Sequence, residues 1–382
     1  MRPLKDPALS VPTLFQIVFG ALTLFGAFML GSSTAQAALG EKDYEAVNAR
    51  IIENQVVPRY EAFATASEAL AEAADSFAED TSEATLIALQ QAFYKTMDAW
   101  MAVEHIRFGP SKFEDRADRI FFWPDRHNTG SRQISRLLKE QDPTALDAEV
   151  FADGTAAVQG LPAMERLLFG GPSQSLLLES NAEAQYLRNV LSAIGNNLDR
   201  LAKELVAAWS DQAESFKTAI SSPDENNPYF KDHKGLTLEL FRSLQEGLTR
   251  IDAYKLSRPL GDGCEKPRPR RSESWRSGRS KENLIINLTA LRDLYGDDTA
   301  LFSIRKYHFD PRLDQSLRMG FDDAISQLKS LSASLSEAVQ NAESCGDVVS
   351  LQEQVKSLSS IVEGDLAQAL ELSAGFNFND GD

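Results

Sequence analysis

The stretch QYLRNVLSAIGNNLDRLAKELVAAW, residues 185–209, decides the fold class of this chain. Its large apolar residues recur every three or four positions, as Leu187, Leu191, Ile194, Leu198, Leu201 and Leu205. This spacing places them on one face of a helix. A long helix with one apolar stripe has to bury that stripe against other helices, so the stretch predicts a helical bundle.

The same helical period recurs along most of the chain, and no stretch shows the sustained alternation of a strand. The sequence therefore predicts an all-α fold. Pro58 is expected to break or kink the first of its helices. Besides 185–209, helices are expected at 41–79, 84–106, 131–139, 155–169, 236–251, 281–294, 314–340 and 347–373.

The order of these elements is similar in two halves of the chain. Each half has a long helix, an irregular loop rich in arginine and aromatic residues, a shorter helix that ends in glycine, and another long helix. GLPAMERLLFG (160–170) and NLTALRDLYG (287–296) occupy equivalent places. We therefore expect an internal duplication, with helical halves at 38–222 and 223–382 that form one unit.

The N-terminus has the pattern of a secretory signal peptide, which we assign to residues 1–37. Arg2 and Lys5 precede an uncharged apolar run over residues 11–30, and the tripeptide Ala35–Ala37 fits the cleavage rule. The pattern predicts export to the periplasm or cell envelope. Because the run is long enough to span a bilayer, an uncleaved anchor is the alternative.

Charge and cysteine content narrow the class of protein further. The chain carries a net charge of −17, which argues against nucleic acid as a partner. Its two cysteines, Cys264 and Cys345, lie in loop-like sequence. In an oxidising compartment they favour a disulfide over two free thiols.

The sequence contains no recognisable catalytic constellation. The zinc motif H-E-x-x-H and the nucleophile elbow G-x-S-x-G are absent. With four histidines at unsuitable spacings, a metal site would have to use carboxylates, which suit iron and hard cations. The candidate metal ligands are Glu104, Asp125 and Glu165. For His105 and His127, an ordinary hydrogen-bonded or exposed histidine is the simpler interpretation.

The segment 266–281 is strongly basic in an otherwise acidic chain, with Glu273 as its one acidic residue before Glu282. Two interpretations remain open. The segment docks onto the acidic remainder of the chain, or it binds an anion or a carboxylate-bearing ligand. Ser274, Ser277 and Ser280, spaced by three, fit helix capping better than catalysis.

Several stretches together resemble the imelysin family. They are VVPRYEAFA (56–64), AWMAVEHIRFGP (99–110), RIFFWPD (119–125), VQGLPAMERLLFG (158–170) and ESWRSGRSKENLIINLTALRDLYG (273–296). The resemblance covers most of the chain after the signal peptide. It implies an exported bacterial protein with two helical halves related by a pseudo-twofold, grouped with metallopeptidases and with iron-regulated envelope proteins.

The family motif Gly-x-His-x-x-Glu is altered in this chain. Gly160 and Glu165 occupy the first and last positions, but Pro162 stands where the family has histidine. Proline has no ligand atom, so the His–Glu metal pair is lost and a peptidase is disfavoured. Pro162 fits the first turn of a helix that begins near Leu161, which places Glu165 close to the N-terminal end.

The resemblance places Glu165 in a pocket between the two halves. A ligand there could be bound by Gly160, Glu165, Arg107, Asp125, Trp123, Ser277, Arg279 and Ser280. A purely structural role for Glu165, paired with Arg107 or Arg119, is the competing interpretation.

We therefore expect an envelope binding or accessory protein linked to iron acquisition. Its partners would be iron, an iron chelate or another small ligand, with an outer-membrane or envelope protein as a further partner. Iron or another divalent metal is the candidate cofactor. The alternatives are a metallopeptidase that uses Glu165 with an unidentified metal site, and an interaction module with a degenerate pocket.

Overall fold

The computed structural model describes residues 39–210, 215–296, 300–304 and 310–372. All regular structure in these ranges is helical, as the sequence predicted. The predicted signal peptide (1–37) and His308 lie outside the described residues. No helix in the described ranges is long and apolar enough to cross a membrane.

The helices of the first part of the chain include the long amphipathic stretch that predicted the fold class. They are α1 (Glu41–Ile51), α2 (Val57–Glu79), α3 (Glu83–Met101), α4 (Arg116–Ile120), α5 (Thr129–Glu140), α6 (Ala148–Asp153), α7 (Leu161–Phe169), α8 (Gly171–Leu176), α9 (Ala182–Ser210) and α10 (Ser215–Ser221).

The second part of the chain contains fewer helices. They are α11 (His233–Arg250), α12 (Ser257–Leu260), α13 (Ser280–Gly296), α14 (Pro311–Ser330), α15 (Leu335–Ala338), α16 (Ala342–Ile361) and α17 (Ala367–Ala369).

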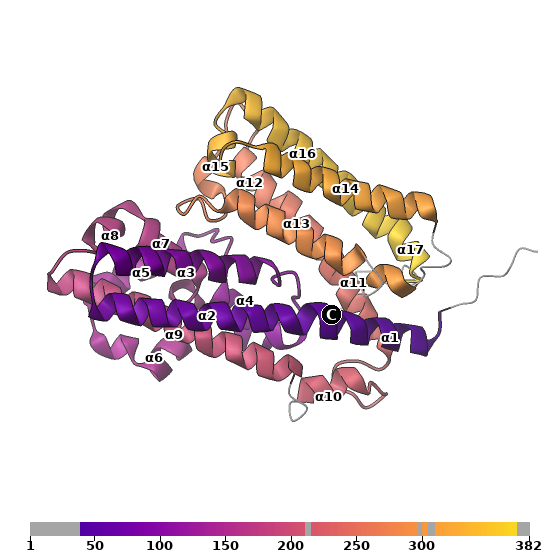
Figure 1. Ribbon diagram of the computed structural model, residues 1–382, viewed down its shortest axis with the longest axis horizontal. Helices are drawn as coiled ribbons and strands as arrows, with labels where there is room; N and C mark the ends of the chain where they lie inside the picture. The colour runs from indigo at the N-terminus through magenta and orange to yellow at the C-terminus, as the bar shows by residue number, and fades with distance from the viewer. Residues whose placement is uncertain (1–38, 211–214, 297–299, 305–309, 373–382) are drawn as a thin grey trace, which may run out of the picture. The chain divides into compact units, whose positions relative to one another are not determined.

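The long helices pack in two groups (Figure 1). In the first, α2 packs against both α3 and α9; in the second, α14 packs against α13 and α16. The apolar stripe of α9 is fully buried in the first group, as its periodicity required. Gly195 lets α9 approach α2 closely, because a Cβ there would lie 3.1 Å from the Ala71 Cα.

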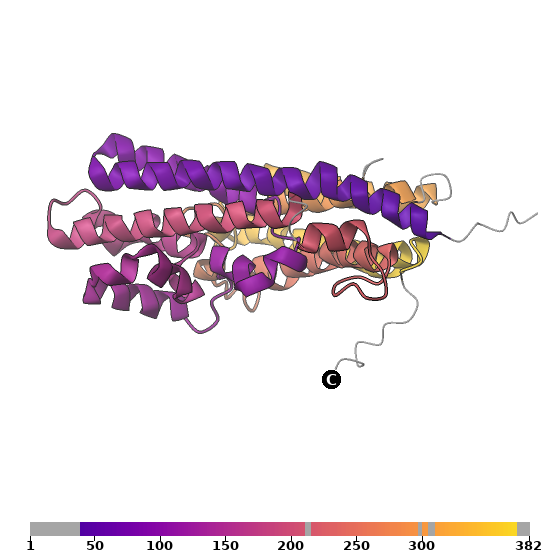
Figure 2. The ribbon, with the colours of Figure 1, turned by 90° about the horizontal axis from the view of Figure 1, so that it is seen from below.

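Pro58 does not end the first helix, but a π-helical segment interrupts the α-helical turns just before it. The chain passes from α1 through a π-helical segment, Ile52–Val56, directly into α2, and the two helices form one unbroken rod (Figure 2). The Val57 N–H donates to the Ile52 carbonyl five residues back. This wider turn accommodates a proline ring that would clash with an ordinary helical turn.

The second half begins in a related way, because α11 passes through the π-helical segment Ile251–Leu256 into α12, which contains Pro259. The rod formed by α1 and α2 also connects the halves, because α1 packs on α11. A second contact between the halves is the packing of α13 on α3. Residues 38–382 accordingly form one compact unit.

Two predicted helices end earlier than expected. The helix predicted at 84–106 ends at Met101, and turns replace it so that Glu104 and His105 are both buried. The helix predicted at 314–340 ends at Ser330. There Leu331 is extended, and Ser334 starts the short helix α15 through a capping box with Glu337.

Candidate functional site: a basic cavity

A cavity of about 470 Å³ lies between segments 122–166 and 258–276. Such a volume is typical of a small-molecule site. We call it the basic cavity, because six arginines line it: Arg126, Arg166, Arg258, Arg270, Arg271 and Arg276. Its remaining lining residues are Phe122, Trp123, Asp125, Asn128, Gly130, Ser131, Ile134, Ala157, Pro162, Ala163, Glu165, Ser272, Ser274 and Trp275.

None of these six guanidinium groups forms an ion pair with another side chain in the described ranges. Arg126 donates to the Tyr254 hydroxyl oxygen at 3.2 Å, and Arg258 lies over the Trp123 ring, 5.8 Å from its centroid. Burial lowers the pKa of Arg258, and the neighbouring Arg271 and Arg126 lower it further. The cavity thus concentrates positive charge, with six arginines against the two carboxylates Asp125 and Glu165 in its lining.

Glu165 docks α7 onto the loop that precedes α13. Its Oε1 accepts hydrogen bonds from the Arg276 N–H (3.1 Å), the Ser277 N–H (2.9 Å) and the Ser277 hydroxyl (2.9 Å). The residue is only 4% exposed. Burial raises the pKa of Glu165, opposed mainly by the hydrogen bonds from Ser277. Its Oε1 therefore holds this loop to α7.

The helix α7 begins at Leu161, with Pro162 in its first turn, as predicted. Gly160 precedes it in extended conformation. A Cβ at Gly160 would lie 2.3 Å from the Ile120 carbonyl oxygen and 2.5 Å from that of Arg119. The glycine therefore allows two backbones to touch, which is a packing role.

Asp125 lines the basic cavity but caps α5. Its two carboxylate oxygens accept hydrogen bonds from the Thr129 and Gly130 N–H groups, both at 2.8 Å. These are the first two N–H groups of α5, which have no partner within the helix. Asp125, like Glu165, is therefore occupied by backbone donors.

A buried cluster of charged side chains anchors the loop 272–280, which carries Trp275 and Arg276. Lys255, 1% exposed, forms ion pairs with Glu104 and, at 3.1 Å, with Glu273. Burial by itself would raise the pKa of Glu104, but the Lys255 ammonium holds that pKa below its usual value. Burial raises the pKa of Glu273. Asn283 adds a hydrogen bond to Glu273 at 3.0 Å.

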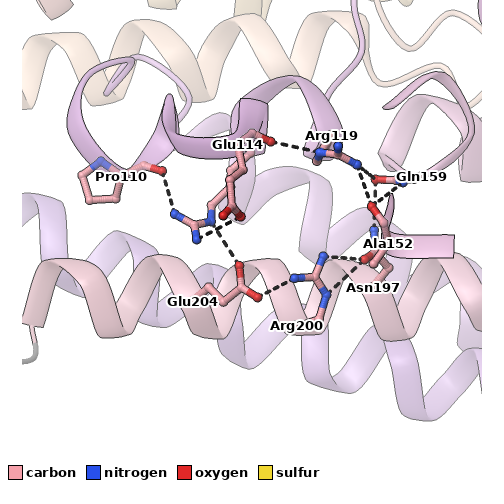
Figure 3. A network of polar contacts seen from close by, with 9 residues as sticks. Pro110, Glu114, Arg119, Ala152, Gln159, Asn197, Arg200 and Glu204 are labelled. Carbon is pink, nitrogen blue, oxygen red and sulfur yellow. Dashed lines mark hydrogen bonds and ion pairs between the residues drawn. The ribbon is translucent and has the colours of Figure 1, made fainter. Parts of the chain in front are cut away.

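The segment that leads into Trp123 and Asp125 is held by the arginine network of Figure 3. The Arg119 guanidinium donates to the carbonyls of Glu114, Ala152 and Gly154 and to the Gln159 side chain. Arg116, on the same short helix α4, forms an ion pair with Glu204 of α9 at 3.1 Å. These bonds hold the segment that continues into Trp123 and Asp125.

The residues predicted to bind a ligand divide into two sets. Trp123, Asp125 and Glu165 line the basic cavity; Arg107, Gly160, Ser277, Arg279 and Ser280 do not. Members of the second set have structural partners. Arg107 pairs with Asp118 at 3.1 Å, Arg279 pairs with Asp98, and the Ser280 hydroxyl donates to the Glu273 carbonyl. Glu165 contacts the backbone of residues 276–277. It does not pair with the side chain of Arg107 or Arg119, the partners that the structural interpretation expected.

Two of the three candidate metal ligands, Asp125 and Glu165, line the same cavity, and Glu104 does not. Glu104 belongs to the Lys255 cluster, while Asp125 and Glu165 bond to separate backbone segments. The described residues contain no group of three His, Cys, Asp or Glu side chains that could hold a metal ion. His105 is buried, and burial lowers its pKa well below the usual value. A carboxylate site for a bare metal ion is thus not formed by these residues.

Cys264 and Cys345 form a disulfide, with Cα atoms 5.8 Å apart. The bridge ties the loop that leads to Arg270 and Arg271 to the start of α16.

The arginines of the basic segment divide into two groups by position. Arg279 docks on Asp98 of α3, and Arg268 pairs locally with Asp262 at 3.0 Å. Arg270, Arg271 and Arg276 instead line the basic cavity. No sequence signal pointed to Arg126, Arg166 or Arg258 as lining residues.

Comparison with known proteins identifies the family of this chain. The imelysin family model matches residues 56–362, so the chain belongs to the imelysin family. It is 23% identical to "Iron-regulated protein A" of Synechococcus elongatus over 279 residues, which cover 72% of this chain and 71% of that protein.

Two crystal structures share the fold, each with a TM-score of 0.72. One is an imelysin-like protein from Psychrobacter arcticum, 20% identical, covering 89% of this chain and 100% of that one. The other is a Parabacteroides distasonis precursor named for iron-regulated protein A, 17% identical, covering 86% of this chain and 96% of that one.

Proposed function

We propose that this protein is an exported accessory component of iron acquisition that binds an anionic iron chelate in the basic cavity. The link to iron rests on the family and on the relatives named for iron regulation. The nature of the ligand rests on one observation: six arginines without ion-pair partners line a cavity whose two carboxylates are bonded to backbone N–H groups.

The charge of the cavity favours a chelate over a bare metal ion. A free cation would be repelled by the arginines, whereas guanidinium groups bind carboxylates and phosphates through charge-assisted hydrogen bonds. Iron held by a carboxylate-bearing chelator presents negative oxygens to its surroundings. The overall acidity of the chain does not oppose this, because the arginines set the local field of the cavity.

Calorimetric titration of the purified mature protein with ferric citrate, citrate, Fe(II) and Zn(II) tests the proposal. We expect the two anions to bind and the bare cations not to bind. Arg271→Ala removes one charge and should weaken citrate binding about tenfold, the equivalent of roughly 1.4 kcal/mol. Raising the salt concentration should also weaken it.

The matched control is Arg136→Ala. Arg136 lies on α5, does not line the basic cavity, and forms an exposed pair with Glu140. It removes the same charge from the protein and should leave citrate affinity unchanged. Equal weakening by both variants would show that net charge, rather than the cavity, governs binding. Tight binding of bare iron that Arg271→Ala leaves intact would refute the chelate proposal.

Export is tested by fractionating cells that produce the full chain and sequencing the N-terminus of the mature protein. We expect a periplasmic protein that begins near Ala38. A chain that keeps its first residues in the membrane fraction would favour the anchor instead.

The metallopeptidase alternative has less support, because Pro162 replaces the motif histidine and the described residues form no three-ligand metal cluster. We expect no peptide cleavage that is sensitive to both a chelator and Glu165→Gln.

A further inference from the structure

A second hollow adjoins the basic cavity. It has a volume of about 880 Å³ and shares five lining residues with the basic cavity: Ile134, Arg166, Arg270, Trp275 and Arg276. We call it the apolar groove, because its own apolar lining consists of Leu138, Phe169, Pro172 and Leu176. Its charged residues outside the shared set are Lys139 and Glu183, which balance each other.

Trp275 forms the wall common to both hollows. Two guanidinium groups lie near its ring, with the Arg276 carbon 4.4 Å and the Arg270 carbon 5.6 Å from the ring centroid. The backbone on either side is fixed: Glu273 pairs with Lys255, and the Ser277 N–H bonds to Glu165. Trp275 therefore places an aromatic side chain with neighbouring positive charge at the wall shared by the two hollows.

The two hollows differ in chemistry. The basic cavity has three further arginines that the groove lacks, Arg126, Arg258 and Arg271. The groove contributes apolar side chains from α5, α7 and α8. An anion alone would leave the groove's apolar surface in contact with water, whereas an apolar group there would remove it at a gain of roughly 25 cal/mol per Å².

We propose that the ligand is a single amphipathic small molecule. Its anionic group lies among the arginines of the basic cavity, and its aromatic or aliphatic body crosses Trp275 into the apolar groove. This inference rests on the proposed function, since it concerns the same site. It adds that affinity comes from both ends of the ligand and that Trp275 joins the two subsites.

Gly171 offers a way to fill the groove without disturbing the basic cavity. It lines the groove at the start of α8, is exposed, and a Cβ built on it meets no atom within 4 Å. Gly171→Trp should therefore fold normally and occupy the groove. Gly346→Trp is the matched control, because Gly346 is also exposed, has equally open space at its Cβ, and lines neither hollow.

Calorimetry with three probes tests the inference: citrate and acetate, which are anions without an apolar body, and 2-naphthoate, a carboxylate with one. We expect 2-naphthoate to bind at least tenfold more tightly than acetate and to compete with citrate. Gly171→Trp should abolish the tighter binding of 2-naphthoate relative to acetate and leave citrate affinity unchanged. Gly346→Trp should change neither the 2-naphthoate affinity nor the citrate affinity. Thermal melts of both variants check that they fold.

The outcomes separate this inference from the proposed function. If citrate binds but 2-naphthoate binds no better than acetate, or if its gain survives Gly171→Trp, the two-part site is refuted and the anion site stands. If 2-naphthoate binds in the expected way but citrate and ferric citrate do not, the two-part site stands and the chelate assignment fails. If no probe binds, both are refuted.

Discussion

Substituting Glu165 tests whether this carboxylate holds α7 to the 272–280 loop. Glu165→Ala removes three hydrogen bonds and leaves the Arg276 and Ser277 N–H groups without their acceptor. An orphaned buried donor costs roughly 1–3 kcal/mol. Relief of the carboxylate's desolvation offsets part of this, so we expect the free energy of unfolding to fall by about 3 kcal/mol.

Glu165→Gln is the informative companion, because the amide oxygen can accept the same three hydrogen bonds without a buried charge. We expect its unfolding free energy to lie within about 1 kcal/mol of the wild type. Urea denaturation followed by circular dichroism measures both variants. The reasoning is refuted if Glu165→Ala changes stability by less than about 0.5 kcal/mol, or if glutamine is as destabilising as alanine.

The pH dependence of stability, compared between the wild type and Glu165→Gln, gives a second readout. Burial raises the pKa of Glu165 above its usual value of 4.5 in the folded chain. Between these two pKa values the folded state holds a proton that the unfolded state releases. The contribution of protonated Glu165 to stability is therefore complete below pH 4.5 and is lost as the pH rises through the pKa of the folded state. Relative to the wild type, Glu165→Gln should become progressively more stable between pH 4.5 and neutrality. A difference that stays constant with pH would contradict this.

Three further changes test the supports of the site, each by urea denaturation. Replacing Cys264 and Cys345 by serine, which opens a loop of 81 residues, should lower stability by about 4.5 kcal/mol in the chain-entropy model; an unchanged midpoint would contradict it. Lys255→Met should cost about 3–5 kcal/mol because it leaves two buried carboxylates uncompensated, and a stabilised variant would show that they become neutral without penalty. Gly160→Ala should cost about 2 kcal/mol through its clash with the Ile120 carbonyl, whereas full tolerance would mean that the backbone yields easily.

The helices followed from the sequence because helical periodicity is a local property. Residues three or four apart share a face wherever the chain goes, so Leu187 to Leu205 predicted α9 and its buried side before any partner was known. The errors were at ends and kinks. The π-helical turn before Pro58 and the end of α3 at Met101 depend on how neighbouring segments pack, which periodicity does not contain.

The site was predicted only in part. Trp123, Asp125 and Glu165 do line the basic cavity, but the serines and Arg279 assigned to ligand binding have structural partners instead. The run of arginines in 266–281 indicated an anion site or self-docking; Arg279 does dock on Asp98, whereas Arg270, Arg271 and Arg276 line the basic cavity. Arg126 and Arg166 were missed because single arginines in an unremarkable context carry no sequence signal.

The sequence by itself determined the helical class, the family and the replacement of the motif histidine by Pro162. Tertiary structure alone decided which charges are neutralised. Glu165 meets the Ser277 N–H across 112 residues, and Lys255 meets Glu104 across 151. Pairings at such separations are set by how helices pack, and the arginines left without carboxylate partners define the basic cavity. The physical reason is that the spacing of apolar residues along the sequence decides helix formation over a few residues, whereas charge compensation depends on which groups lie close together in the folded chain.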